Sequence, residues 1–328
     1  MSPSTASSIR IPDGAKKIVT IGGGTGSYTM LTGLKEFPLE ITAVVNMFDS
    51  GGSAGILRDE FGVLPPGDVR RCLLALSEGE QASILRDLFT YRFNGGTGLN
   101  GHSFGNLFLL ALSSIYGGEI EGIRKASELL NLKGVVLPVS LDNSHIHAKL
   151  EDGTEIIGET NIDIPKHDGK LKITDVFLDP PAKLFDETRD AIVAADSIVV
   201  CPGDLYSSLV PTFLVEGMSD ALKESKAKKI LVSNLMTKWG ETNGFVASDA
   251  ARELLRFSGL PKFDHAICNT GTMDPDLVRA YEKENKFPML LDDRMKDYAT
   301  EVVTGDFFSE ADIARHDSKK IAEIISRL

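Results

Sequence analysis

The chain has 328 residues, which is enough for one large α/β unit or about two average domains, with a sizeable core that needs no disulfides. Hydrophobic residues make up 42% and charged residues 25%, which excludes disordered, collagen-like and membrane-embedded proteins. With 35 Lys and Arg against 47 Asp and Glu, the formal net charge is −12, so the chain lacks the basic surface of a general nucleic-acid-binding protein. Any polyanionic ligand must therefore be bound locally.

The cysteines and the N-terminus indicate a reducing compartment. Cys72, Cys201 and Cys268 are far apart in apolar surroundings, without the spacing of a disulfide framework or a zinc site. No segment approaches 18 uninterrupted apolar residues, and the start of the chain has no apolar core of a signal peptide. We therefore expect a cytoplasmic protein that does not enter the membrane, with a loose tail over residues 1–16.

The first part of the chain predicts two units of strand, glycine loop and helix. A β-branched run at 18–21 precedes the glycine loop 22–26 and a helix predicted at 27–36. A second strand, predicted at 39–46, precedes the glycine-rich loop 49–55. Four helices are then expected, at 69–77, 81–91, 103–115 and 120–130, and together they form a helical insertion over about residues 66–130.

A β-hairpin excursion is expected over about residues 140–180. Apolar and polar residues alternate from 146 to 151 and run into an Asp-Gly pair, which is typical of a half-buried strand that ends in a hairpin turn. His145 and His147 share a face of this strand, but no third ligand accompanies them, so a metal site is not supported.

The alternation of strands and helices then resumes. The predicted elements are a strand at 134–138 before the hairpin and, after it, a helix at 184–195, a strand at 197–201, a helix that follows the loop 202–204 and runs to about 224, strands at 229–232 and 265–268, and a helix opened by Asp274 and Pro275. This order predicts a Rossmann-like three-layer α/β sandwich with a mostly parallel sheet, in which residues 17–328 form one domain. Ligands of such sheets bind at the carboxyl ends of the strands, where the glycine loops fall.

The first glycine loop matches neither standard nucleotide fingerprint. In the G-x-G-x-x-G pattern, Ser27 takes the place of the third glycine when the count starts at Gly22, and Thr29 takes it when the count starts at Gly24. This failure disfavours a nicotinamide-dependent dehydrogenase, and no Gly-Lys-Ser/Thr follows for a P-loop. Free amides at the start of the next helix still favour an anion, with a plain tight turn as the alternative.

Asp49 stands at the end of the second predicted strand, before a glycine cluster. A carboxylate there can accept ribose hydroxyls, hold Mg²⁺ beside phosphates or act as a base, and it can equally cap a turn. Arg58, Arg70 and Arg71 suit bidentate phosphate recognition, although ion pairing on a helix surface is the simpler interpretation for at least one of the last two.

Two other clusters lie where helices are expected to begin. His102 stands with Ser103 and Asn106 at the start of an apolar helix, as a ligand-binding group or as a hydrogen-bonded structural residue. Ser207 and Ser208 follow the third glycine loop, where they can contact phosphate or cap the next helix.

Several long motifs occur in one order along the chain. They are Ile21-Gly-Gly-Gly-Thr-Gly26, Phe48-Asp49-Ser-Gly-Gly-Ser-Ala-Gly55, Leu64-Pro-Pro-Gly-Asp-Val-Arg70, Gly101-His-Ser-Phe-Gly-Asn106, Pro202-Gly203-Asp-Leu-Tyr206-Ser207, Asn234-Leu-Met-Thr237 and Gly240-Glu-Thr-Asn-Gly244. In this arrangement the chain resembles the bacterial gluconeogenesis factor family, the relatives of 2-phospho-L-lactate transferase (CofD-like), from about residue 17 to about residue 270.

The resemblance implies a Rossmann-like fold, a cytoplasmic location and binding of a nucleotide or nucleotide sugar, which is a UDP-sugar in the gluconeogenesis factor branch. It also implies a role in carbon partitioning toward cell-wall precursors and in cell shape. The transferase branch instead uses Mg²⁺ and moves a phospholactyl group from a guanylyl diphosphate carrier to a deazaflavin alcohol.

The motifs also place a nucleotide site on this chain. The residues expected to line it are Gly23, Gly24, Thr25, Gly26, Asp49, Gly67, Asp68, Arg71, His102, Ser103, Asn106, Gly203, Asp204, Tyr206, Ser207, Asn234, Met236 and Thr237. In the transferase interpretation Asp49 would be the catalytic residue and the Mg²⁺ ligand.

Three positions depart from the family pattern. Ser50 stands where the family has a second aspartate, which weakens a two-carboxylate metal site, and Asp204 puts an acid beside the expected phosphate region. Trp239 stands where proline is common.

The leading hypothesis is a protein that binds a UDP-sugar and signals to a regulatory partner enzyme. The alternative is a Mg²⁺-dependent transferase of phosphorus-containing groups that acts on a nucleotide diphosphate donor. In either case we expect a homo-oligomer and no nucleic-acid partner.

Overall fold

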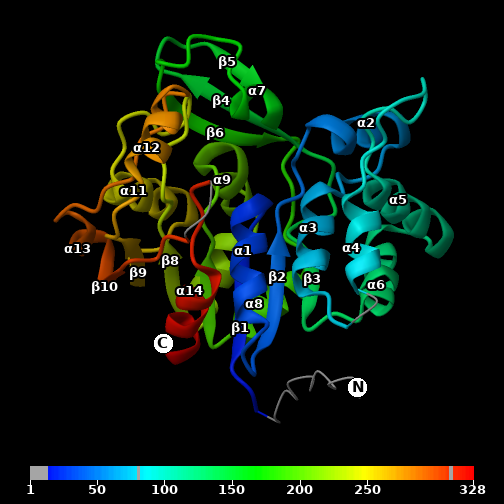
Figure 1. Cartoon of the computed structure of the whole chain (residues 1–328), viewed down its shortest axis with the longest axis horizontal. Coiled ribbons are helices and arrows are strands. Elements are labelled where there is room, and N and C mark those ends of the chain that lie inside the picture. The colour runs from blue at the N-terminus through cyan, green and yellow to red at the C-terminus, as the bar shows by residue number, and fades with distance from the viewer. Residues whose placement is uncertain (1–13, 80–81, 310–312) are drawn as a thin grey trace.

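A parallel sheet of seven strands runs through the molecule in the order β10-β9-β8-β7-β1-β2-β3 (Figure 1). The structure, a computed structural model, describes residues 14–79, 82–309 and 313–328. The strands are β1 (Lys17–Gly22), β2 (Glu40–Val45), β3 (Val135–Pro138), β7 (Ser197–Val200), β8 (Lys228–Val232), β9 (Phe263–Asn269) and β10 (Ala299–Gly305). All neighbouring pairs are parallel, so their carboxyl ends share one edge.

The central strands are short and buried on both faces. In β1, Ile18, Val19 and Ile21 are β-branched and almost inaccessible to solvent, and every residue of β7 is buried. Continuous apolar runs of this kind are typical of a parallel sheet covered by helices on both sides.

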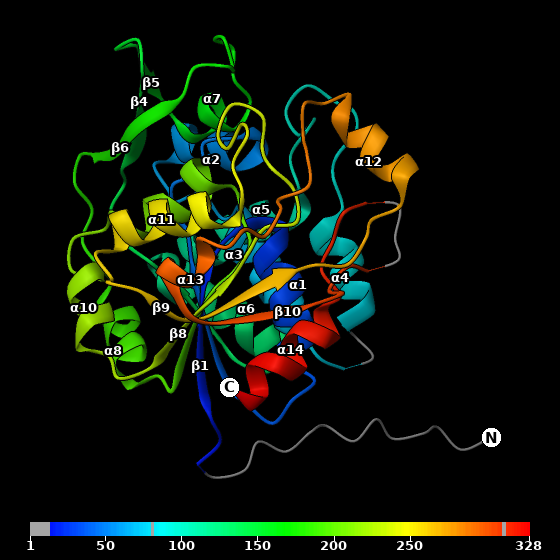
Figure 2. The same ribbon diagram turned by 90° about the vertical axis from the view of Figure 1, so that its left-hand side faces the viewer.

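Helices cover both faces of the sheet, as the view along its plane shows (Figure 2). One layer contains α1 (Gly24–Leu34), α3 (Gly67–Leu76) and α14 (Ser318–Arg327), and the other contains α8 (Asp186–Ala194), α10 (Met218–Glu224) and α11 (Ala247–Ser258). The predicted three-layer α/β sandwich is therefore confirmed.

Most of the helices between β2 and β3 are those predicted from the sequence. Besides α3, they are α4 (Ala82–Thr90), α5 (Phe104–Tyr116) and α6 (Glu119–Leu130). The helix α2 (Gly52–Phe61) was not predicted, because its first turn contains the glycines that suggested a loop. It ends at Gly62, whose left-handed backbone suits a helix C-terminus.

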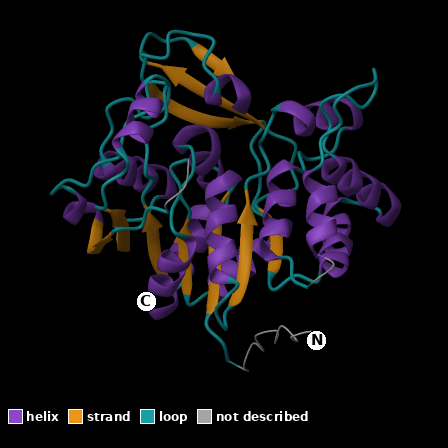
Figure 3. Ribbon diagram, in the orientation of Figure 1, coloured by secondary structure: helices purple, strands orange, loops and turns teal. Residues whose placement is uncertain are grey.

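The hairpin excursion forms a separate small sheet above the carboxyl edge of the main sheet (Figure 3). It contains β4 (His145–Leu150), β5 (Glu155–Ile157) and β6 (Ile173–Asp179), all antiparallel, together with the short helix α7 (Glu159–Asp163). The alternating apolar side chains of β4 are buried, as the pattern predicted. The hairpin thus carries α7 toward the glycine loops.

The single helix predicted from the loop 202–204 to about residue 224 is wrong. The segment contains a π-helical turn, η1 (Leu205–Leu209), then α9 (Val210–Phe213) and, after a break, α10. Gly217 precedes α10 with φ +94°, a conformation that interrupts a helix. The remaining helices are α12 (Pro275–Glu282), capped by Asp274 as predicted, and α13 (Met295–Tyr298).

Two of the domain predictions have no test here. The tail expected over residues 1–16 lies mostly outside the described residues, and that residues 17–328 form one domain stays a prediction. In the part of the chain that the structure describes, no helix is long and apolar enough to cross a bilayer.

The strand order places a topological switch point between β1 and β7, where the chain leaves the sheet in opposite directions. The loops after these strands approach so closely that a Cβ on Gly26 would lie 1.7 Å from the carbonyl oxygen of Pro202. Only glycine allows the two backbones to meet at this distance.

We expect Gly26→Ala to push these loops apart, and therefore to destabilise the fold by about 2 kcal/mol or more and to abolish ligand binding in the cleft. Thermal unfolding followed by circular dichroism measures the first effect. The matched control is Gly98→Ala, because Gly98 has open space around it. Equal melting temperatures for the two variants would contradict the role of this contact.

Candidate functional site

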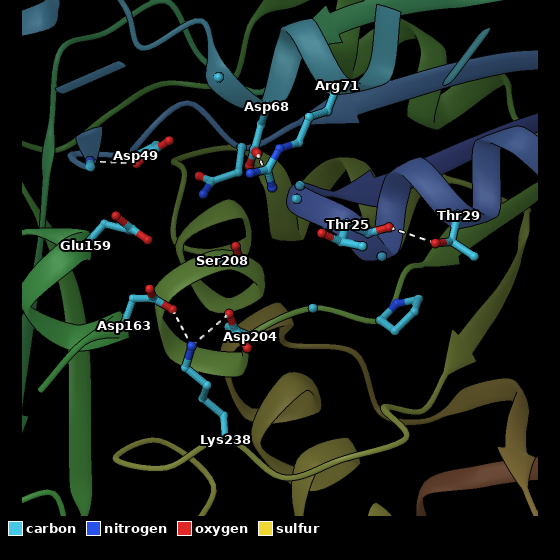
Figure 4. Close-up of a pocket in the computed structure, with 18 of the residues that line it drawn as sticks. Thr25, Thr29, Asp49, Asp68, Arg71, Glu159, Asp163, Asp204, Ser208 and Lys238 are labelled. Carbon is cyan, nitrogen blue, oxygen red and sulfur yellow. Dashed lines mark hydrogen bonds and ion pairs between the residues drawn. The ribbon is translucent and has the colours of Figure 1, made fainter. Parts of the chain in front are cut away.

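A cleft of about 590 Å³ opens at the switch point, between the carboxyl edge of the sheet and the hairpin excursion (Figure 4). The loops after β1, β2, β7 and β8 form its floor, and α7 lies on the opposite wall. The lining residues that the sequence analysis had named are Gly23, Gly24, Thr25, Gly26, Asp49, Gly67, Asp68, Arg71, Asn106, Gly203, Asp204, Asn234, Met236 and Thr237. Segments far apart in the sequence thus meet in one place.

The first loop delivers the N-terminus of α1 to the cleft. Asp68, on the first turn of α3, accepts a hydrogen bond from the backbone amide of Gly24. The following amides, of Thr25 and Gly26, lie in the first helical turn, where no preceding turn supplies a carbonyl. They are available to an anion.

The surroundings of Asp68 disfavour the ionised form of its carboxyl group. Burial, and then the nearby charge of Asp49, raise the pKa of Asp68 to about 6. The guanidinium of Arg71, 3.9 Å away, only partly offsets this. Because Arg71 is half exposed and its ion pair is long, it keeps its donors for a ligand.

The second loop presents Asp49, whose carboxylate accepts from the amide of Gly51 at 2.7 Å. A second carboxyl group, that of Glu159 on α7, is hydrogen bonded to Asp49 and also accepts from the amide of Ser50 at 3.4 Å. Burial and the charges of Asp49 and Asp163 raise the pKa of Glu159. The surroundings of Glu159 therefore favour the neutral form of its carboxyl group.

Ser50, which replaces an aspartate of the family pattern, fastens the hairpin excursion to this loop. Its hydroxyl oxygen accepts from the amide of Thr160 at 3.0 Å and lies 3.1 Å from the Thr160 hydroxyl. The hairpin excursion also brings the carboxyl group of Glu159 to this loop.

His102 and Ser103, predicted as ligand contacts, do not line the cleft. Both are buried against Ser53, whose hydroxyl oxygen accepts from the Ser103 amide at 3.3 Å and lies 3.2 Å from Nδ1 of His102. Asn106 donates to the same oxygen at 3.3 Å and reaches the cleft. This motif anchors the start of α2 to the start of α5.

In the third glycine loop, which follows β7, the backbone amides at the start of η1 already donate to a side chain of the protein. Glu241 is fully buried, and its carboxylate accepts from the amides of Tyr206 and Ser207 at 2.7 and 3.2 Å and from the Ser207 hydroxyl at 2.8 Å. Tyr206 and Ser207 are themselves buried beneath the cleft. A side-chain carboxylate therefore sits where a phosphate was expected, and only Gly203, Asp204 and Ser208 of this region line the cleft.

Burial and the charge of Asp204 raise the pKa of Glu241. Carboxylate oxygens of Asp163, Asp204 and Glu241 converge within 4.8 Å of one another. The ammonium group of Lys238 lies 2.6 Å from Asp163 and 3.5 Å from Asp204 (Figure 4). This internal cation supplies the charge that a metal would supply, so the cluster does not need one.

The loop after β8 is held in place by two side chains of the Asn234-Leu-Met-Thr237 motif. The amide group of Asn234 accepts from the Gly203 nitrogen at 3.0 Å and donates to the Gly203 oxygen at 2.7 Å. The Thr237 hydroxyl accepts from the amide of Phe287 at 2.9 Å. Further along, the indole of Trp239 packs against Gly169 of the hairpin excursion.

Basic side chains balance the acids of the cleft. Among the described residues that line it, the cations are Arg70, Arg71, Arg92, Lys238, Lys286 and Arg315, and the carboxylates are Asp49, Asp68, Glu159, Asp163 and Asp204. In a chain of net charge −12, the cleft thus offers an anion a nearly balanced local charge, with Arg71 as a half-exposed cation.

The other arginines named from the sequence have internal partners. Arg70 lines the cleft but donates to the Asn106 side chain at 2.9 Å and to the Phe89 carbonyl at 3.0 Å. Arg58 contacts His145 of the hairpin and does not line the cleft.

Sequence reasoning missed the residues that reach the cleft from the hairpin and from the C-terminal part of the chain. They include Glu159, Thr160, Asp163, Lys238, Tyr281, Lys286 and Arg315. Lys238 lies between two of the quoted motifs, so it could have been predicted from its position next to them. The others carry no local signal, because only the docking of distant segments brings them to the glycine loops.

Comparisons with known proteins place the chain among described relatives. The family model of 2-phospho-L-lactate transferase CofD matches residues 18–308. The chain is 41% identical to the gluconeogenesis factor of Halalkalibacterium halodurans over 313 residues, 94% of this chain and 95% of that protein. It is 43% identical to a putative gluconeogenesis factor of Thermotoga maritima over 320 residues, 95% and 99% of the two chains.

The fold has a counterpart among solved structures. The crystal structure of protein BH3568 from Bacillus halodurans superposes with a TM-score of 0.89 at 40% sequence identity. The match covers 95% of this chain and 99% of that one.

Replacing Glu241 tests the capping of η1. We expect Glu241→Ala to lower the free energy of unfolding by about 2–4 kcal/mol, because three buried donors lose their acceptor, and Glu241→Gln to cost less, because one oxygen remains. Urea unfolding measures both. The exposed Glu224→Ala is the control, and a Glu241→Ala variant as stable as this control would refute the capping role.

The raised pKa of Asp68 predicts that its contribution to the free energy of unfolding depends on pH. Its folded pKa of about 6 exceeds the ordinary value of 3.8, so its charge destabilises the fold increasingly as the pH rises from about 4 to 6, and fully above 6. Asp68→Asn should therefore raise the free energy of unfolding by about 2 kcal/mol at pH 8 and by much less at pH 4.5. Exposed Asp190→Asn is the control. A gain for Asp68→Asn that is independent of pH would contradict the assignment.

Proposed function

Because this chain belongs to the gluconeogenesis factor family, the relatives of 2-phospho-L-lactate transferase, we propose that its cleft binds a nucleotide sugar, specifically a UDP-sugar. Binding would regulate a partner enzyme and so direct carbon toward cell-wall precursors and influence cell shape. The family match supports the general role, and the nature of the cleft supports the ligand.

The observation that carries this proposal is the switch-point cleft with its free amides and half-exposed arginine. Its volume of about 590 Å³ lies in the range of small-molecule sites. The amides of Thr25 and Gly26, with Arg71 beside them, suit a diphosphate, since helix N-termini and guanidinium groups are the usual partners of phosphate oxygens.

The opposite wall suits the sugar. Glu159 and Asp163 of α7 line the cleft there, next to Asp204 and Ser208 from the segment after β7, and carboxylate and hydroxyl oxygens accept hydrogen bonds from sugar hydroxyls. An anionic group would be repelled from this acidic wall. The cleft thus has one end for the diphosphate and another for a neutral polyhydroxylated group.

A specific observation favours the alternative, a Mg²⁺-dependent transferase. Mg²⁺ in proteins takes one or two carboxylates together with substrate phosphates. The carboxyl groups of Asp49 and Glu159 are next to each other at the cleft, and a divalent cation held by both would offset the negative charge that burial disfavours, so these residues fit the ion. When bound, Mg²⁺ would neutralise charge on a diphosphate donor. Asp49 and Glu159 would hold it, while Arg71 orients the phosphates.

Isothermal titration with UDP-, GDP- and ADP-linked sugars tests the proposal. We expect the UDP-sugar to bind, and Arg71→Met to weaken its Kd about tenfold or more, because a charge-assisted contact to phosphate is lost. Arg189→Met is the control, since Arg189 is equally exposed and lies on α8, on the other side of the sheet. If no UDP-sugar binds, or if the two variants weaken binding equally, the proposal fails.

The two functions separate in a second experiment. Transfer of a phospholactyl group from a guanylyl diphosphate donor to a deazaflavin alcohol, with the guanylyl group as the leaving group, is assayed with Mg²⁺ for the native chain and for Asp49→Ala. Tight UDP-sugar binding without turnover supports the regulator. Turnover that Asp49→Ala abolishes supports the transferase and overturns the regulatory role.

A further inference from the structure

Arg70, on α3, is a buried cation without a carboxylate partner. It lines the cleft but is only 9% exposed, and its guanidinium group forms no ion pair with any described carboxylate. Its Nε and Nη1 donate to neutral acceptors, the Asn106 side chain and the Phe89 carbonyl, and its Nη2 has no partner among the described residues. Because an unpaired charge is costly to bury, this side chain calls for a counter-ion from the cleft.

Positive charge exceeds negative charge around Arg70. Burial, and then the positive charges of Arg71 and Arg92, lower the pKa of Arg70 to about 10, and the charge of Asp68 offsets only part of this. Arg71, the next residue on α3, points elsewhere and lies over the start of α1, where a Cβ on Gly24 would be 3.6 Å from its Nη1. The charge of Arg70 is therefore left without compensation.

Arg92, between α4 and α5, is a second cation at this end of the cleft. It is exposed, lines the cleft and forms no ion pair with a described carboxylate. Its backbone bridges to Ser103, whose amide donates to the Ser53 hydroxyl oxygen at 3.3 Å. Arg70 reaches the same oxygen through Asn106, which donates to it at 3.3 Å. The two arginines come from different segments, and both lie around the start of α2.

The start of α2 adds unpaired backbone donors. This helix has ten residues, and no side chain caps its N-terminus. The amides of Gly52, Ser53 and Ala54 form its first turn and donate to no other described residue. All three residues line the cleft. Free amides at a helix N-terminus carry partial positive charge, so they add to the attraction of an anion toward Arg70.

Two acids separate these donors from those at the start of α1. Asp68 accepts from the amide of Gly24, at the start of α1, and Asp49 accepts from the amide of Gly51, just before α2. In Figure 4, Asp68 lies between Asp49 and Thr25. The cleft therefore contains two separate groups of anion donors.

We propose that Arg70, Arg92 and the start of α2 bind the phosphate group of a second small molecule, separate from the diphosphate expected at α1. The donors come from three segments and so surround the ligand from several directions, which suits a tetrahedral phosphate better than a planar carboxylate. The phosphate would be the counter-ion that Arg70 lacks. This inference does not depend on a UDP-sugar in the cleft, because other residues carry it.

Thermal unfolding in rising concentrations of inorganic phosphate, at constant ionic strength, tests the proposal on the full chain. A ligand of the folded state raises the melting temperature in a saturable way. The Arg71→Met variant lacks the cation at α1, so the phosphate effect that it retains reports the second site. In this variant we expect a further Arg92→Met substitution to weaken the apparent Kd for phosphate about tenfold or more, because a charge-assisted contact is lost.

The matched control is Arg124→Met in the same variant, since Arg124 is a half-exposed arginine of the same helical insertion, on α6, and should leave the Kd unchanged. Equal weakening by Arg92→Met and Arg124→Met would overturn the proposal. Loss of all phosphate dependence in Arg71→Met alone would also overturn it, because phosphate would then bind only at α1. An equal rise of the melting temperature with acetate would show that the site does not select phosphate, and would overturn the assignment.

Crystals of the native chain soaked in sodium tungstate provide a second measurement, because tungstate is a tetrahedral anion that anomalous scattering locates directly. We expect density between the side chains of Arg70 and Arg92 and the start of α2, in addition to any density at α1. Density at α1 alone would overturn the proposal. Tungstate at the second site without a saturable effect of phosphate in solution would identify an adventitious ion only, and would overturn it as well.

Discussion

The pairing of loop amides with internal carboxylates is the interaction on which the rest of this site depends. At the carboxyl edge of a parallel sheet, each strand-to-helix loop exposes backbone donors that need acceptors. Asp68 accepts from the first loop, Asp49 and Glu159 accept from the second, and Glu241 accepts from the third. Acidic residues, which outnumber the basic residues of the chain, thus shape the loops of the cleft.

This arrangement decides where an anion can bind. Glu241 closes the third loop to phosphate, whereas the first loop keeps the amides of Thr25 and Gly26 open beside Arg71. The first and third glycine loops both precede a helical turn, but only the first leaves its amides free for a ligand. The amides that follow the third loop donate to the buried carboxylate of Glu241. The diphosphate of a nucleotide is accordingly expected at the N-terminus of α1, and the acidic wall around Asp163 is left for neutral hydroxyl groups.

The two insertions contribute to the molecule in different ways. The hairpin excursion completes the cleft, since Ser50 fastens α7 to the second loop and α7 supplies Glu159. The helical insertion supports the cleft through Arg70, which joins α3 to the end of α4 and the start of α5.

Much of this could be predicted from the sequence, because local patterns record local structure. The β-branched runs, the glycine loops and the alternation before Asp152 determined the sheet, the switch-point edge and the hairpin, and the ordered motifs indicated the family. The tertiary structure alone decided which polar groups are left for a ligand. His102 and Ser207 proved to be internal, and Glu159 proved to lie in the cleft. Their hydrogen bonds join segments 34 to 109 residues apart, so they depend on how those segments pack, and the sequence of neither segment shows a pattern that predicts them.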